Sequence, residues 1–444
     1  MKNKLLHSRG TFILSLILFK VILDFAYVNF INVVYAASYH RFFIEVEIQN
    51  YVFCWLIYLS FMPVLRHRLL QVSDYFSSTA VLGLIGPLCT VAGLDASRSL
   101  YPVLVSAAAI MVIAVVCRKE QIRLIRIPHL PGVSSWALTA SGFVVAFVAM
   151  WYVFSGAVAN LNFDLSAVYE FRAVNSQITD VGFVAYLNIW AYKVFSIFLL
   201  TYAVWKKKKT AVVAIVVLQV FFFGVTAHKA VLFFPFLVFA IWYYFKRNNL
   251  AIALPVTFGL AVLIAYAGYA LFDAQMLASM IIRRVFFVPA AATFSYFEFF
   301  STTPYVYWAD SVLSPFISYD YSMPLSYIIG DFMLNPEMGA NNGFISRGYA
   351  HAGLFGVGIY VLMLCILLKF LDSLTQSGVP LWVSLCVTAI PIRTVIFSSD
   401  LFTSLVSHGF LWSVILLLAV RKDPERRPEA ASWRGSGYAN QARG

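Results

Sequence analysis

The stretch KKKKTAVVAIVVLQVFFFGVTAHKAVLFFPFLVFAIWYYFKR, residues 206–247, decides the fold. It contains two apolar runs, 210–227 and 230–245, which are joined by a very short turn at His228 and Lys229 and flanked by basic residues at both outer ends. A helix needs about 20 apolar residues to cross the hydrocarbon core of a bilayer. Lys and Arg gather at the cytoplasmic ends of such helices. The stretch therefore predicts two membrane-spanning helices whose connecting turn faces outside.

Similar apolar runs recur along the whole chain of 444 residues, in which 61% of residues are hydrophobic and 12% are charged. A soluble domain carries about 25% charged residues. We therefore expect an all-α polytopic membrane protein with about twelve spans. The other predicted spans cover residues 11–35, 48–65, 74–93, 99–117, 136–156, 184–205, 250–272, 350–370, 379–398 and 403–420. Residues 1–420 are expected to form one transmembrane domain, and 421–444 a charged, disordered cytoplasmic tail.

The distribution of the 32 Lys and Arg residues predicts the orientation of these spans. With the N-terminus in the cytoplasm, most of these residues fall in cytoplasmic segments, as the positive-inside rule requires. Both termini are then cytoplasmic, and two long loops at 157–183 and 273–349 lie outside. The net charge of +12 is explained by this topology, so nucleic-acid binding is not expected.

Four arginines lie outside, where topology gives no reason for them: Arg172, Arg283, Arg284 and Arg347. A guanidinium is always charged, and its planar donors match phosphate oxygens. These residues predict an anionic ligand on the outer face. The alternative is that each arginine pairs with a local acid. The acids considered are Asp164, Glu170 or Asp180 for Arg172, and Glu298 or Asp310 for Arg283 or Arg284.

Further ionisable residues lie at the outer ends of predicted spans. Lys229 begins one span in apolar surroundings, which makes it a candidate functional residue; the alternative is a lysine that extends to the interface. Arg393 and Asp400 lie near the outer end of the span 379–398, and we expect them to pair with each other.

The segment NNGFISRGYAHAGLFGVG, residues 341–358, is the densest polar and glycine-rich cluster. Its glycines permit close backbone approach to a ligand or to a neighbouring helix. Arg347 and His351 are four residues apart and share a helix face, and a histidine can act as acid or base near neutral pH. The alternative is that the glycines serve helix packing alone and that His351 bonds a carbonyl group.

Aromatic residues dominate the segment 286–327 of the second outer loop. We expect it to lie in the membrane interface as short amphipathic helices, or to line a groove for a sugar. The histidines are scattered and form no metal-binding motif, so neither a metal nor a cofactor is expected.

Five pieces of the chain are VYEFR at 168–172, HKAVLFFPFL at 228–237, RRVFFVP at 283–289, the segment 341–358 and SSD at 398–400. In their order and their predicted place on the outer face, these pieces resemble the Wzy-type O-antigen polymerases. The resemblance implies periplasmic transfer of a glycan from undecaprenyl pyrophosphate onto a new lipid-linked repeat unit. Direct attack on the donor would invert the anomeric centre, and the missing metal motif makes the expected reaction metal-independent. It also implies location in the inner membrane and suggests a partner that regulates chain length.

The resemblance and the charge pattern together suggest roles for ten residues. The group expected to hold the pyrophosphate and stabilise its developing charge comprises Arg172, Arg284 and Arg347, with Lys229. Either His351 or Glu170 is expected to act as the base for the acceptor hydroxyl. Further substrate contacts are expected from Tyr169, Arg283, Asn342 and Asp400.

Three other functions remain open. An O-antigen ligase would share the donor and the topology. A polyprenyl-phosphate glycosyltransferase would use an acid in the first outer loop, which offers Glu45 and Glu47. A flippase or transporter of lipid-linked sugars, which is not an enzyme, should show inverted repeats or broken helices.

Overall fold

The structure is a computed structural model that describes residues 8–38, 41–119, 132–164, 168–179 and 181–421. Within these ranges the regular structure is helical, and extended contacts are limited to two isolated bridges, Glu45–Asp95 and Arg68–Leu250. The predicted all-α class is therefore confirmed for the described residues. The predicted tail lies outside them, apart from Arg421.

Nine helical segments in the described ranges are long and apolar enough to cross a membrane. They are Arg9–Tyr35 (α2, η1, α3), Val72–Leu94 (α5, η2, α6), Tyr101–Arg118 (α7), Val133–Phe154 (α8), Gly182–Trp205 (α10, η4, α11), Lys209–Thr226 (α12), Ala253–Phe272 (α14), Gln275–Thr302 (α15, η5, α16) and Phe344–Gln376 (α18). Four shorter apolar helices are α4 (Ile48–Leu59), α13 (Lys229–Phe245), α19 (Leu381–Phe397) and α21 (Phe410–Val420). A set of long apolar helices of this kind is typical of a polytopic membrane protein.

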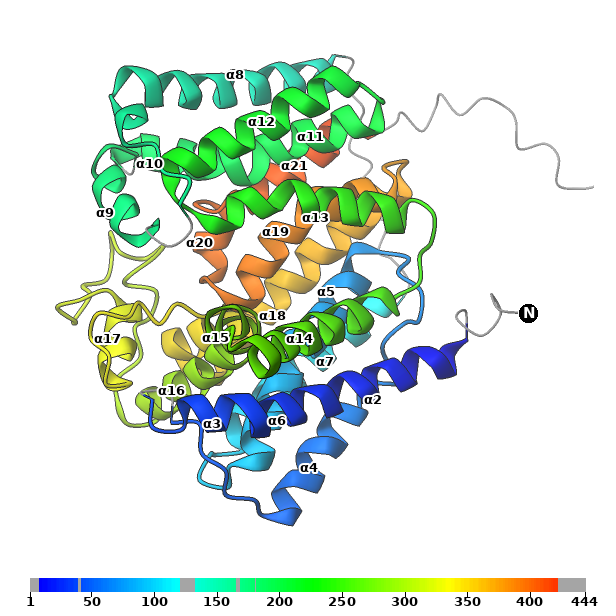
Figure 1. Cartoon of the computed structure of the whole chain (residues 1–444), viewed down its shortest axis with the longest axis vertical. Coiled ribbons are helices and arrows are strands. Elements are labelled where there is room, and N and C mark those ends of the chain that lie inside the picture. Colours follow the sequence, from blue (N-terminus) through cyan, green and yellow to red (C-terminus); the bar gives the residue numbers. More distant parts are fainter. Residues whose placement is uncertain (1–7, 39–40, 120–131, 165–167, 180, 422–444) are drawn as a thin grey trace, which may run out of the picture.

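Eight of the nine long segments coincide with predicted spans, but Gln275–Thr302 does not. It occupies the first part of the predicted outer loop 273–349, so the prediction of short helices in this region was wrong there. The charges of Arg283, Arg284 and Glu298 interrupt its apolar character and hid it in the sequence. In Figure 1, α15 is viewed almost end-on while α2 and α14 run across the picture, so this helix begins at a steep angle to its neighbours.

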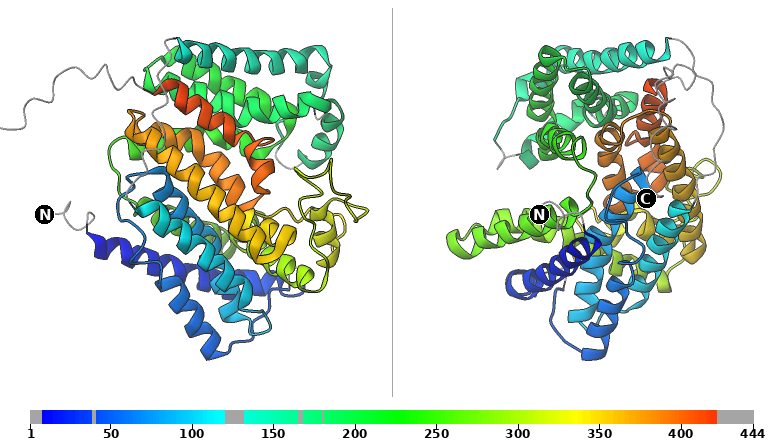
Figure 2. Two further views of the ribbon diagram at one scale, coloured as in Figure 1. Left: turned by 180° about the vertical axis from the view of Figure 1, so that it is seen from behind. Right: turned by 90° about the vertical axis from the view of Figure 1, so that its right-hand side faces the viewer.

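Helix α18 lies near the centre of the molecule. It packs against α7, α16 and α19. One group of helices, α8, α11, α12 and α21, lies on one side of α18 and α19, and another, α2, α4, α6 and α14, lies on the other side (Figures 1 and 2). Helix α13 packs against both α12 and α19 and so connects the first group to this centre.

The elements between the long helices gather at one end of the molecule. Figure 1 shows α9 (Val168–Thr179) and α17 (Leu325–Phe332) at the left end, where α3 also ends, while α2 begins at the right beside the N-terminus. The tight turn predicted at His228 is confirmed, because α12 ends at Thr226 and α13 begins at Lys229. Ala227 makes this turn in a left-handed conformation, with φ of 51°.

Candidate functional site

The glycine-rich segment forms a helical hairpin rather than one straight helix. Ala352 (φ −157°, ψ 35°) and Gly353 (φ 59°, ψ −140°) break α18 into residues 344–351 and 354–376. A Cβ atom added to Gly356 would lie 2.0 Å from the carbonyl oxygen of Gly348. Two residues eight positions apart in a continuous helix would be about 12 Å apart. The short first helix is therefore folded back onto the start of the second, and the glycines act in packing, as one of the two predictions proposed.

The loop after α16 covers the end of the short helix. The amide groups of Val306 and Tyr307 donate hydrogen bonds of 2.9 Å to the carbonyl oxygens of Ala350 and His351. These carbonyl groups lose their helical partners at the break, so the loop satisfies them. The aromatic loop is thus held directly over the hairpin.

A network of charged and aromatic residues, here called the Arg347 network, lies at the hairpin. It consists of Arg347, His351, Tyr360, Trp308, Asp310 and Asp400. Arg347 Nη2 donates a 2.5 Å hydrogen bond to Asp310 Oδ2. Asp310, which the sequence suggested as a partner for Arg283 or Arg284, is therefore the partner of Arg347. The predicted common face of Arg347 and His351 is confirmed, since His351 Nδ1 also lies 3.8 Å from Asp310 Oδ1.

The side chain of His351 is fully buried, and both of its ring nitrogens have partners. The amide of Trp308 can only donate, so Nδ1, at 3.2 Å, accepts this hydrogen bond and the ring proton lies on Nε2. Nε2 then donates to Asp400 Oδ1 at 3.2 Å. The indole of Trp308 stacks on the imidazole at 5.3 Å between ring centroids and shields it further.

Asp400 joins the hairpin to α20 (Leu401–Leu405). One carboxylate oxygen accepts from His351 and Tyr360, and the other caps α20 by accepting from the amides of Phe402 and Thr403. Burial raises the pKa of Asp400, but the hydrogen bond from His351 and the charge of Arg347 outweigh burial and lower the pKa to about 2. The predicted ion pair between Asp400 and Arg393 is absent among the described residues; Asp400 is bonded to the hairpin instead.

Two buried polar atoms of the Arg347 network, Arg347 Nε and Asp310 Oδ1, make no hydrogen bond to the described residues. Buried polar groups almost always have partners, so an unsatisfied pair marks a place where a ligand or solvent group can bind. By contrast, the Asn342 side chain, predicted to contact substrate, is buried and its amide donates to Pro289 O, Thr293 Oγ1 and Ser346 Oγ. Its hydrogen bonds hold α16 against α18.

A separate pocket, here called the Lys229 pocket, brings two predicted cations together. It has a volume of about 440 Å³, and Lys229 and Arg284 both line it. The other lining residues are Tyr35, Gln275, Met276, Ser279 and Met280. Lys229 and Arg284 bring two positively charged groups to this pocket.

Arg283 supports one wall of the Lys229 pocket. Its Nε donates to Ser279 Oγ at 3.0 Å, and its guanidinium lies over the Tyr35 ring at 4.4 Å from the centroid. Both contacts use residues that line the pocket. Arg283 is therefore placed to orient these residues and to add a second layer of positive charge.

Helix α9 carries three more predicted residues, Tyr169, Glu170 and Arg172, whose side chains lie outside the described part of the chain. The backbone of α9 is fixed by Asn175, which donates to the carbonyl of Val225 at 2.7 Å. Arg172 precedes Asn175 by one helical turn, and Lys229 follows Val225 by four residues. The fold thus brings the backbone of α9 to the start of α13.

The Lys229 pocket and the Arg347 network are distinct but belong to neighbouring elements. Arg284 precedes Pro289 by five residues on one continuous helix, and the carbonyl of Pro289 accepts from Asn342, which precedes Arg347 by five residues. Arg284 lines the Lys229 pocket, whereas Arg347 is bonded to Asp310 in the Arg347 network. That both arginines bind one pyrophosphate stays a prediction.

Sequence reasoning missed the partners of the predicted residues. Asp310 was considered only for other arginines, and Tyr360 and the structural role of Trp308 were not foreseen, because all three depend on contacts across 37 to 52 residues. Within the described ranges, no group of three His, Cys, Asp or Glu residues is arranged to hold a metal ion. Comparison with known protein families, with curated proteins and with solved structures finds no match to this chain.

Proposed function

We propose that this chain is a glycosyltransferase of the bacterial inner membrane that polymerises oligosaccharide repeat units carried on undecaprenyl pyrophosphate. The observation that carries the proposal is the Lys229 pocket, where Lys229 and Arg284 line one space. A diphosphate is a natural ligand for such a pocket, because its oxygens accept charge-assisted hydrogen bonds from both cations.

A lipid carrier fits the surroundings of this pocket. Leu271, Phe272 and Met276, at the end of α14 and the start of α15, are 73%, 80% and 65% exposed. Large apolar side chains are exposed in this way where lipid replaces water as the neighbour. A polyprenyl chain could follow this surface while its diphosphate enters the pocket.

The proposed orientation has about twelve spans, both termini in the cytoplasm and the pocket near the periplasmic face. Two facts support it. Most Lys and Arg residues then lie in cytoplasmic segments. In addition, α9 and α17 lie at the end of the molecule opposite the start of α2 (Figure 1).

In the proposed reaction, an acceptor sugar hydroxyl attacks the anomeric carbon of the donor. A new glycosidic C–O bond forms while the bond to the diphosphate breaks, and the lipid diphosphate leaves with the electron pair. Lys229 and Arg284, with Arg172 from α9, stabilise the negative charge that develops on the leaving group. Direct displacement inverts the anomeric centre.

The hydroxyl proton passes to a carboxylate, for which we propose Glu170 on α9. His351 was the other predicted base, but its Nδ1 lone pair already accepts the Trp308 amide and its ring is buried. We assign His351 and Arg347 a positioning role: they hold Trp308 and Asp310, and with them the aromatic loop that packs on the sugars and excludes water.

The test uses Arg172→Ala, Arg284→Ala and Arg347→Ala, each with a check of its level in the membrane. We expect loss of long polymer in all three, and partial recovery with Lys at 172 and 284, because lysine keeps the charge but not the planar donor geometry. Polymer of normal length in all three alanine variants would refute the proposal. Labelling of single cysteines introduced at the same positions checks their periplasmic exposure.

A second candidate function is transport of a lipid-linked sugar. The break of α18 at Ala352 and Gly353 favours it, since discontinuous helices next to charged groups are typical of secondary transporters. A deletion strain separates these functions. Loss of a polymerase leaves lipopolysaccharide with a single repeat unit, whereas loss of a flippase or of a ligase leaves none.

A further inference from the structure

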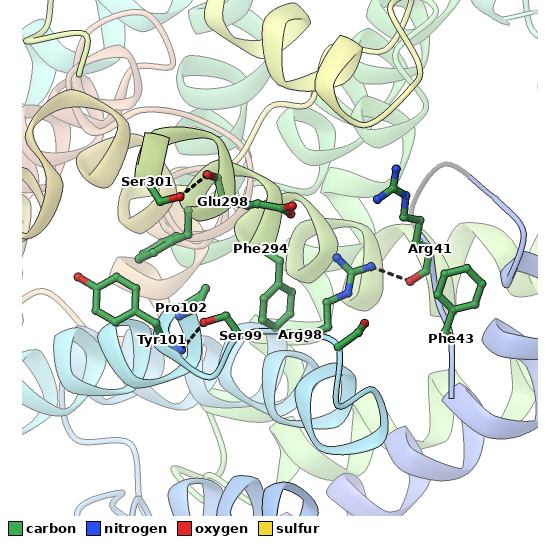
Figure 3. Close-up of a pocket in the computed structure, with 11 residues that line it drawn as sticks. Arg41, Phe43, Arg98, Ser99, Tyr101, Pro102, Phe294, Glu298 and Ser301 are labelled. Carbon is green, nitrogen blue, oxygen red and sulfur yellow. Dashed lines mark hydrogen bonds between the residues drawn. The ribbon is translucent and has the colours of Figure 1, made fainter. Parts of the chain in front are cut away.

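A cavity of about 520 Å³ lies apart from both the Lys229 pocket and the Arg347 network. Figure 3 shows this cavity, here called the Tyr101 pocket, between the loop that starts α7, the loop after α3 and helix α16. Its volume is within the range of about 300 to 1,000 Å³ typical of small-molecule sites. The functional residues discussed so far do not line it.

The walls of the Tyr101 pocket are held in place by hydrogen bonds. Arg98 Nη2 donates to the carbonyl of Arg41 at 2.6 Å, and Arg98 Nε lies 3.3 Å from Asp95 Oδ2. The amide of Glu45 donates to Leu94 O at 2.9 Å, which ties the two loops together. The pocket is therefore preorganised, and a ligand need not order these loops on binding.

The pocket combines aromatic rings with polar groups. Tyr101 is 42% exposed, and its ring lies 5.8 Å from that of Phe297. Ser99 and Ser301 add hydroxyl groups. Sugars present both apolar C–H faces, which pack on aromatic rings, and hydroxyl groups, which exchange hydrogen bonds with polar side chains.

Charge distinguishes this pocket from the Lys229 pocket. Arg41, Arg98 and Glu298 line it, and Arg98 is already paired with Asp95. The side chains of Arg41 and Glu298 extend towards the cavity (Figure 3), and neither forms a hydrogen bond or ion pair with another described residue. Asp95 does not line the pocket but offsets the charge of Arg98, and the remaining lining charges, Arg41 and Glu298, are opposite in sign. Glu298 also places a negative charge in the pocket itself, which disfavours a diphosphate.

We infer that the Tyr101 pocket binds a neutral oligosaccharide, with Glu298 and Arg41 bonding sugar hydroxyls and Tyr101 packing on a ring. Binding of a saccharide does not depend on the proposed reaction; only the identification of this saccharide as the acceptor glycan rests on the proposed function. A chain of rings connects the pocket to the hairpin, since Tyr101 lies 6.2 Å from Tyr349, which lies 6.1 Å from Tyr305. A saccharide bound in the pocket would thus be linked to the aromatic loop through these ring contacts.

The experiment uses the full-length protein in lipid nanodiscs and saturation-transfer NMR. The probes are three neutral trisaccharides, maltotriose, cellotriose and chitotriose, and inorganic pyrophosphate. We expect at least one trisaccharide to bind, and Glu298→Gln and Tyr101→Ala each to weaken it about tenfold, the effect of losing one strong hydrogen bond or one ring contact. Glu337→Gln, which changes an exposed acid outside the pocket, should bind as the unmodified protein does.

Two results would overturn the inference: no trisaccharide binds, or pyrophosphate displaces the bound trisaccharide. Equal affinity in Glu298→Gln and the unmodified protein would also exclude this pocket, provided that the variant unfolds at the same temperature. Pyrophosphate binding, measured in parallel with Lys229→Ala, tests the proposed function separately. Failure of that arm alone leaves the Tyr101 pocket intact, and failure of the trisaccharide arm alone leaves the Lys229 pocket intact.

Discussion

Replacing Gly356 by alanine tests the helical hairpin directly. The new Cβ atom would lie 2.0 Å from the carbonyl oxygen of Gly348 and 3.0 Å from its carbonyl carbon, whereas ordinary contacts begin near 3.4 Å. The two helices must therefore separate by about 1.4 Å, and neither atom is at the end of a flexible side chain. Overpacking of this kind costs about 3 kcal/mol when the backbone must move.

Gly358→Ala is the matched control, because a Cβ atom at this position meets nothing within 4 Å. Both glycines lie in the same helix, and in a continuous helix either substitution would raise the unfolding free energy of the protein by about 0.5 to 1 kcal/mol. The hairpin instead predicts that Gly356→Ala lowers the unfolding free energy while Gly358→Ala raises it. We expect Gly356→Ala to unfold about 5 °C lower and Gly358→Ala at or slightly above the temperature of the unmodified protein.

The assay is thermal unfolding in detergent, followed by circular dichroism, with polymer length measured in cells. A displacement of about 1 Å at a positioning element can lower a rate about a hundredfold, so Gly356→Ala should also shorten the polymer. If Gly356→Ala unfolds at the same temperature as Gly358→Ala or above it, the fold-back at Ala352 and Gly353 does not exist. The Arg347 network would then have to be rejected with it.

Three further predictions concern the Arg347 network. Because the pKa of Asp400 is lowered from 3.8 to about 2, its ionised form stabilises the fold at all pH values above about 4, and this contribution is lost as the pH falls through about 2. Asp400→Asn should therefore lower the unfolding free energy by about 2 kcal/mol at pH 7, whereas Asp320→Asn, at an exposed position, should leave it unchanged. If the unfolding free energy depends on pH in the same way in Asp400→Asn and the unmodified protein, the lowered pKa is wrong. Arg347→Met should lower the unfolding free energy by about 3 kcal/mol, because it leaves the Asp310 carboxylate without its partner, and adding Asp310→Asn should recover most of this loss. Additive effects of the two substitutions in a double-mutant cycle would disprove the ion pair. Trp308→Ala should make the loop at 303–324 more sensitive to protease, since the His351 imidazole loses its stacked ring; an unchanged cleavage rate would show that the stack does not hold the loop.

The sequence by itself determined the class and most of the helices. Hydropathy and helix length are local properties, so the runs around Lys209–Thr226 and Lys229–Phe245 could be placed from composition alone. The common face of Arg347 and His351 followed from the helical repeat. The helix at Gln275–Thr302 was missed, because its charged residues make its local signal resemble that of a loop.

Only the tertiary structure decided how these parts meet. The break at Ala352 and Gly353 places Gly348 against Gly356, and no local pattern states whether a glycine-rich helix continues or folds back. Asp310 reaches Arg347 across 37 residues, and Lys229 meets Arg284 across more than fifty, through packing of separate helices. Hydropathy specifies which residues enter the membrane, whereas the partner of each buried charge depends on close packing between segments distant in the chain, which is a property of the whole fold.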